Sequence, residues 1–145
     1  MRRGYGAALL AHLESRPNAG LLSGSPERLT RETAELNAHA RAAWLERDRF
    51  EPILRRHPNA EHAWLHWSFW PGTVITRAAA EKLVPFFEDP ELARIIDGSP
   101  LQATEETLIP TFTALLGLRV EQNPFSNRFS DTAWNTTSTR STWRA

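Results

Sequence analysis

Two adjacent carboxylates late in the chain have the type and spacing needed for acid–base chemistry. Glu105 and Glu106 follow Thr104, a residue able to cap a helix, so both fall in the first turn, where the helix dipole favours negative charge. A carboxylate held in place can take the proton of an attacking hydroxyl group. Neighbouring helical residues point about 100° apart, so only one of the two can face a given site. We expect one glutamate to be a general base, or both to be ordinary residues of a helix N-terminus.

A second unusual feature is the segment 63–77, which is rich in aromatic and β-branched residues around Pro71-Gly72. Such residues favour extended structure. Alternation along a strand puts Trp67 and Phe69 on one face and Ser68 and Trp70 on the other. Tryptophan rings stack on sugars as readily as they fill a core. We predict that one face is core and that Ser68 and Trp70, on the other face, line a substrate pocket.

Two motifs resemble those of one enzyme family. Ile75-Thr76-Arg77 follows the aromatic segment, and Glu106-Thr107-Leu108-Ile109-Pro110-Thr111 lies further on. Together they resemble the inverting GT-A glycosyltransferases of the core-two branching N-acetylglucosaminyltransferase and peptide O-xylosyltransferase type. In that family an aromatic strand leads into a Leu/Ile-Ser/Thr-Arg step that opens a helix. An Asp/Pro-Glu-x-aromatic/aliphatic-x-x-Thr segment comes later.

The resemblance implies that Glu106 is the catalytic base of an inverting sugar transfer. We predict that Ser68, Trp70, Arg77 and Glu105 bind substrate. The substrates would be a nucleotide-sugar donor and a sugar or glycan acceptor. No metal site and no cofactor is predicted.

The implied fold is α/β, a partial GT-A-like (nucleotide-diphospho-sugar transferase) fold with a small mixed sheet and flanking helices. Residues 1–126 resemble the acceptor side of such an enzyme, and residues 127–145 are expected to be an irregular or disordered tail, since they are polar and lack periodicity. The resemblance implies a sugar-nucleotide half before the matching motifs, and we do not expect residues 1–66 to supply it. We therefore expect a fragment that is inactive alone and binds sugar nucleotides weakly or not at all.

Two other functions compete with this hypothesis. A non-enzymatic module would bind protein or carbohydrate through the aromatic cluster Trp64–Trp70. A small metal-binding protein would use His57, His62 and His66. Two of these histidines are four residues apart, but neither zinc-protease motif is present, and the spacing loses its meaning if the segment is a strand.

Composition narrows the remaining classes. The 145 residues include 17 basic and 17 acidic side chains, so no net charge draws the chain to nucleic acid. There is no cysteine, which permits a reducing compartment, and we predict a cytoplasmic location. No run of 18 apolar residues suggests a transmembrane segment. With 41% hydrophobic and 23% charged residues, the chain has the composition of one folded soluble domain.

The carboxylates and aromatic residues must be positioned by a few regular elements. We predict a mixed sheet in which Ser68–Thr76 lies with Leu21–Ser23 and Leu118–Val120. Pro71-Gly72 is expected to be a turn between two strands, and residues 23–33, rich in Ser, Gly, Pro and charge, a surface loop.

Helices are predicted over residues 5–15 and 35–56, the latter broken at Pro52. Thr76 and the pair Asp89-Pro90 are start signals for two more helices, the second ending at Gly98. The last helix starts after its cap at Thr104, kinks or divides at Pro110, and ends at Gly117.

Overall fold

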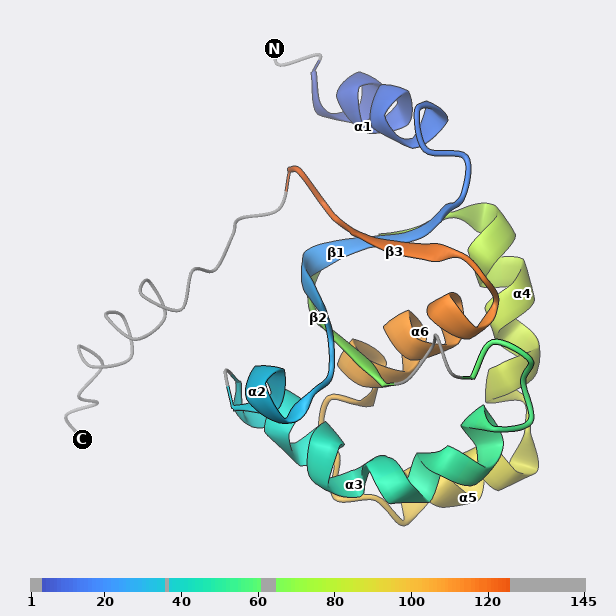
Figure 1. Cartoon of the computed structure of the whole chain (residues 1–145). Helices are drawn as coiled ribbons and strands as arrows, with labels where there is room; N and C mark the ends of the chain where they lie inside the picture. Colours follow the sequence, from blue (N-terminus) through green and yellow to red (C-terminus); the bar gives the residue numbers. More distant parts are fainter. Residues whose placement is uncertain (1–3, 36, 61–64, 126–145) are drawn as a thin grey trace, which may run out of the picture.

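The fold is a small mixed sheet with helices packed mainly on one side, as seen in the computed structural model (Figure 1). The structure describes residues 4–35, 37–60 and 65–125, so the tail predicted over residues 127–145 lies outside the described residues. The elements follow the chain in the order α1 (Tyr5–Glu14), β1 (Ala19–Arg28), α2 (Arg31–Ala34), α3 (Ala38–Leu54), β2 (His66–Ile75), α4 (Arg77–Phe87), α5 (Pro90–Asp97), α6 (Thr104–Leu115) and β3 (Arg119–Gln122).

The sheet has the order β2-β1-β3, with β1 in the centre. Strand β1 is antiparallel to β2 and parallel to β3, so Leu21 lies opposite Ile75 on one side and Val120 on the other. The predicted mixed sheet with flanking helices is therefore confirmed, and each strand overlaps the segment predicted for it. Strands β1 and β2 are longer than predicted.

Strand β1 corrects the prediction of a surface loop over residues 23–33. The strand continues to Arg28, and α2 follows it, capped by Thr30. Between Gly24 and Glu27, β1 advances three residues while β2 advances two, from Phe69 to Trp67. The extra residue forms a β-bulge, and Ser25 has a left-handed φ of 43°. A bulge accommodates Ser, Pro and Gly inside a strand, which is why a loop-like composition is strand here.

The structure of β2 corrects the prediction of two strands joined by a turn at Pro71-Gly72. It runs as one strand past Pro71-Gly72. Its pairing with β1 steps from Phe69 to Val74 while β1 moves only from Gly24 to Leu22. The three additional residues of β2 form a large, irregular bulge, in which Gly72 has a φ of 78°. Because β1 lies alongside both halves of the segment, the halves pair with β1 rather than with each other.

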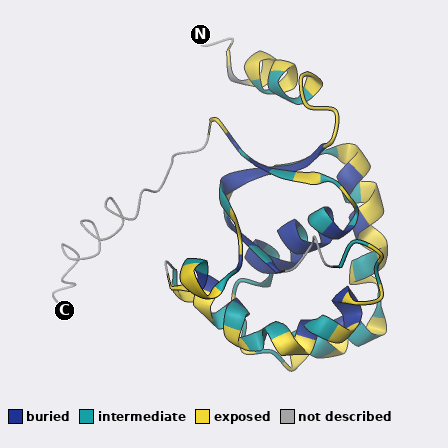
Figure 2. Ribbon diagram, in the orientation of Figure 1, coloured by how far each residue is buried: buried dark blue, intermediate teal, exposed yellow. Residues whose placement is uncertain are grey.

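Helix α6 lies between the sheet and helices α3 and α5, and is largely buried (Figure 1, Figure 2). Its apolar side chains join one core with those of the sheet and the other helices. The buried members are Leu29, Ala40, Ala43, Phe50, Ile53, Leu54, Leu65, Trp67, Ala79, Leu83, Leu92, Leu108, Phe112 and Leu115. Gly20 lies so close to Leu118 and Thr113 that a side chain would not fit, since a Cβ atom there would lie 2.8 Å from both Leu118 Cβ and Thr113 Cγ2.

The helix ends combine confirmed and corrected predictions. Thr76 and Asp89 cap α4 and α5, and Gly98 ends α5, as expected. After α6, Gly117 has a φ of 72° and its amide donates to the Ala114 carbonyl, while the Leu118 amide donates to the Thr113 carbonyl, the pattern of a Schellman motif.

Pro52 does not break the helix as predicted. It lies inside α3, close to its C-terminal end. The hydrogen bond that proline removes is therefore lost near a helix end rather than at its centre. Asn37 caps α3 by accepting hydrogen bonds from the amides of His39 and Ala40.

Helix α1 stands apart from the packed helices (Figure 1). An ion pair of 2.6 Å between Arg16 and Glu121 and an edge contact between His12 and Phe125 connect this end of the chain to the segment around β3. In the described part of the chain, every helix is too short or too polar to span a lipid bilayer.

Candidate functional site around Glu106

The candidate site begins at the first turn of α6. Ala103, not the predicted Thr104, occupies the N-cap position, and it makes no side-chain capping hydrogen bond. The amide of Glu106 donates instead to the Ala103 carbonyl, at 3.2 Å. Pro110 lies within α6 and the helix is continuous across it, so the predicted division into two pieces does not occur.

The carboxylate of Glu106 is buried against β2, with 8% of the residue exposed. It accepts two hydrogen bonds, one from the indole Nε1–H of Trp67 to Oε2 and one from the backbone N–H of Trp70 to Oε1, both at 3.3 Å. Both are longer than an ordinary N–H···O bond, so lone pairs of the carboxylate are only partly used. No Arg, Lys or His within the described ranges forms an ion pair with it.

Thr111, the last residue of the Glu106–Thr111 motif, anchors α6 to the same strand. Its hydroxyl oxygen accepts a hydrogen bond of 2.9 Å from the amide of His66. The same hydroxyl lies 2.6 Å from the Thr107 carbonyl within α6. The two ends of the motif therefore bind two amides of β2, at His66 and Trp70. The spacing from Glu106 to Thr111 serves a structural purpose as well as any chemical one.

Glu105 differs from its neighbour. It is half-buried, and no hydrogen bond joins it to β2 among the residues that the structure describes. The orientation expected for Glu106 is observed, since its carboxylate is the one that reaches the Ser68–Trp70 segment. Successive helical residues diverge by about 100°, which accounts for the separation of the two side chains.

The structure brings Trp67 to Glu106 rather than the side chains of Ser68 and Trp70. Trp67 is buried in the core and Phe69 packs against that core, so this face is the core face. Alternation turns Ser68 to the other face. The Ser68 hydroxyl is buried and has no hydrogen-bond partner in the described part of the chain. Trp70, half-buried, meets Glu106 through its backbone amide.

Sequence reasoning therefore missed Trp67 as a member of the site. The available signal was that a buried tryptophan usually finds an acceptor for its indole N–H. Which acceptor that would be depends on how α6 crosses β2, and the sequence does not show this.

Arg77 lies away from this carboxylate. It is the first residue of α4, is exposed, and forms an ion pair of 2.7 Å with Glu81 one turn further on. The Ile75-Thr76-Arg77 motif thus ends a strand and begins a helix, with Thr76 as the cap. The predicted role of Arg77 in substrate binding has no support from its position.

The histidines that the structure describes do not gather into a metal site. The His57 ring packs against the Phe86 ring at an angle of 39°, with ring centroids 4.8 Å apart, and His66 lies on β2. His62 and Trp64 lie outside the described residues. Within the described ranges, no group of three or more His, Cys, Asp or Glu side chains is placed to hold a metal ion.

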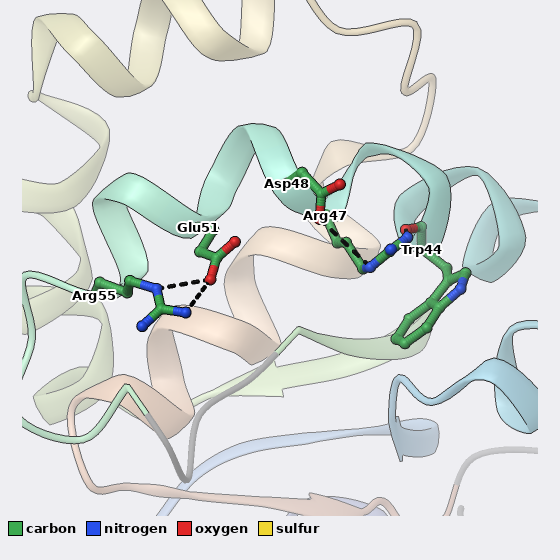
Figure 3. A network of polar contacts seen from close by, with 5 residues as sticks. All are labelled: Trp44, Arg47, Asp48, Glu51 and Arg55. Carbon is green, nitrogen blue, oxygen red and sulfur yellow. Dashed lines mark hydrogen bonds and ion pairs between the residues drawn. The ribbon is translucent and has the colours of Figure 1, made fainter.

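A separate polar network lies along α3 (Figure 3). The guanidinium carbon of Arg47 is 4.6 Å from the centre of the Trp44 ring, and Arg47 also pairs with Asp48. Further along the helix, Arg55 pairs with Glu51 one turn before it. An ion pair of that spacing on a helix surface contributes about 0.3–0.5 kcal/mol. These contacts stabilise α3 and take no part in the site at Glu106.

The geometry around Glu106 is that of a buried carboxylate held by two N–H donors at the edge of a strand, without an ion pair to any described residue. Comparisons of the chain with protein-family models, curated proteins and solved structures find no match.

Proposed function

We propose that this chain is the acceptor-side part of an inverting, sugar-nucleotide-dependent glycosyltransferase, in which Glu106 is the general base. The observation that carries the proposal is the burial of Glu106 against β2 without a cation beside it in the described part of the chain. The Ile75–Arg77 and Glu106–Thr111 motifs support it.

The geometry suits proton transfer from an acceptor hydroxyl. Two N–H donors fix the orientation of the carboxylate but leave lone pairs for a further donor. The N-terminal turn of α6 favours its negative charge through the helix dipole. The acceptor hydroxyl would donate to Glu106 while its oxygen attacks the anomeric carbon of the donor sugar, and the proton would pass to the carboxylate as the new glycosidic bond forms. The bond between the anomeric carbon and the nucleoside diphosphate would break in the same step, and the diphosphate would leave with that electron pair.

A half-buried Trp70 beside this carboxylate suits a sugar acceptor. Its backbone amide marks the place where β2 meets Glu106. Its indole ring offers an apolar face of the kind on which sugar rings stack. Trp67 is used for the core and for Glu106, so the binding-module alternative has fewer free aromatic faces than the sequence suggested.

The test uses NMR to monitor acceptor binding through the signals of the two N–H groups that hold Glu106. In ¹H–¹⁵N spectra, a millimolar oligosaccharide with free hydroxyl groups should shift the Trp67 indole and Trp70 amide signals. Trp67→Phe identifies the indole signal. Glu106→Gln should remove the response, and Glu105→Gln should retain it. Equal responses in both variants, with binding lost only in Trp70→Ala, would favour a carbohydrate-binding module.

Catalysis is tested by transfer from a uridine diphosphate sugar to the same acceptor, in a complete enzyme that carries this part. The base assignment predicts a loss of roughly 10²–10⁴-fold in Glu106→Gln. Glu105→Gln should change the rate far less. Equal losses in the two variants would show that Glu106 is not the base.

A further inference from the structure

The two edges of the sheet differ in how their backbone groups are used. At the β2 edge, two side chains of α6 accept hydrogen bonds from backbone amides. Thr111 accepts from the amide of His66, and Glu106 accepts from the amide of Trp70. Helix α6 thus closes the edge of β2 to another strand.

The β3 edge is open at its centre. The amides of Arg119 and Asn123 turn toward the β1 side, where they donate to the carbonyls of Asn18 and Ser23 at 2.8 and 2.9 Å. Backbone groups alternate along a strand, so the N–H and C=O of Val120 point away from β1. No described residue pairs with Val120 on that side.

We propose that β3 pairs antiparallel with β3 of a second copy of this chain, about a two-fold axis at Val120. In this register the two Val120 residues face each other and exchange two N–H···O=C bonds. Arg119 of each chain then lies opposite Glu121 of the other. The interface is the same patch on both chains, as a two-fold axis requires.

Charge favours this register over its neighbours. Arg119 is 70% exposed, whereas Glu121 is 7% exposed and pairs with both Arg16 and Arg119. Glu121 Oε1 lies 3.0 Å from Arg119 Nε but accepts no well-directed hydrogen bond within the described chain. An arginine has five N–H donors, so each Arg119 can serve the Glu121 of both chains. A register shifted by two residues would lose this reciprocal match.

The assembly would stop at two chains. Pairing through β3 uses the open edge, and α6 blocks the other edge at β2, so further copies cannot add to the sheet. A four-residue strand offers a small contact, so the dimer should be weak and dependent on concentration.

Sedimentation at increasing concentration tests the proposal. The chain should pass from monomer toward dimer, without larger species. Val120→Pro removes the central donor from each chain and should weaken the dimer by roughly tenfold or more. Val120→Thr keeps the N–H and the β-branched shape, and should dimerise normally. If Val120→Pro does not fold, Arg119→Glu is the substitute, because it sets a carboxylate opposite Glu121 of the other chain and should also weaken the dimer by roughly tenfold or more.

The absence of cysteine allows a direct test of register. Facing residues of a hydrogen-bonded antiparallel pair have Cα atoms about 5.5 Å apart, within the range of a disulfide. Val120→Cys should therefore form disulfide dimers readily on mild oxidation. Leu45→Cys, at a 66% exposed position on α3, is the matched control and should form them slowly.

Three results would overturn the proposal. The first is sedimentation of the wild type as a monomer at millimolar concentration. The second is dimerisation of Val120→Pro and Arg119→Glu as strong as that of the wild type. The third is cross-linking of the two cysteine variants at equal rates. None of these readouts depends on glycosyltransferase activity, so the dimer and the proposed function are tested separately.

Discussion

The β2 and β3 edges of one sheet show two uses of the same backbone chemistry. At the β2 edge, strand amides are bound by Glu106 and Thr111 of α6. At the β3 edge, the backbone groups of Val120 point away from β1. A carboxylate that closes a strand edge is also held in a fixed place, so the structural role of Glu106 is compatible with the chemical role proposed for it. No helix of the described chain covers the β3 edge in this way, and in the proposed dimer charge selects the strand that pairs with it.

The largest loss of stability is expected from substitution of Trp67, which belongs both to the core and to the closed β2 edge. Trp67→Ala should lower the free energy of unfolding by about 3–5 kcal/mol, because a large buried side chain is lost. Trp67→Phe should cost less, because it retains most of the apolar volume and loses the donor to Glu106. Urea denaturation of the two variants measures how much of this edge depends on packing. Equal losses would show that the hydrogen bond, not the packing, dominates.

Substitutions of Thr111 test the second contact that closes the β2 edge, the hydrogen bond from the His66 amide to the Thr111 hydroxyl. Thr111→Val leaves the amide of His66 without its acceptor and should cost about 1–3 kcal/mol. Thr111→Ser keeps the hydroxyl and is the matched control. Hydrogen exchange should be faster at the His66 amide in Thr111→Val alone. If both variants protect this amide equally, Thr111 does not close the edge.

Glu106→Gln should change the free energy of unfolding less than the activation free energy of the proposed sugar transfer. Glu106→Gln presents one acceptor oxygen to two N–H donors and should lower the free energy of unfolding by about 1 kcal/mol. Glu105→Gln should stay within about 0.5 kcal/mol of the wild type. Denaturant midpoints compare the two variants. A loss of several kcal/mol in Glu106→Gln would mark this carboxylate as mainly structural.

The smallest change in stability is expected from substitution of Val120 at the open β3 edge. Val120→Pro should change the stability of the dilute monomer by no more than about 0.5 kcal/mol, because the N–H that it removes points away from β1. The measurement is thermal unfolding at low concentration, where the proposed dimer is absent. A large loss there would show that the Val120 amide is used within the chain, and the contrast between the two edges would fail.

Local signals predicted several parts of this fold correctly. Thr76 and Asp89 cap helices, and Gly117 ends one, because each acts within a few residues of its own position. The face shared by Trp67 and Phe69 is core, as alternation along a strand requires. The choice of Glu106 over Glu105 as the carboxylate facing β2 also came from the sequence motif.

Errors arose where partners distant in sequence decide the structure. The Pro71-Gly72 pair looks like a turn, but β1 pairs with the residues on both sides of it and makes it a bulge. The Ser- and Pro-containing segment after Ser23 looks like a loop, but pairing with β2 extends it into a strand. Turn-forming residues specify a change in backbone direction, whereas a bulge and a turn differ in which strand lies beside them.

Local sequence accounts for the mixed strand and helix content, for the caps of α4 and α5, and for a carboxylate in the first turn of α6. Packing between distant segments set what that carboxylate meets, because it brings the Trp67 indole to Glu106 and leaves Arg77 with Glu81 on the surface. Packing also set which edge of the sheet is closed. Caps and periodicity arise from contacts within one or two turns, whereas these pairings depend on how α6 crosses β2, and Trp67 and Glu106 are 39 residues apart in the chain.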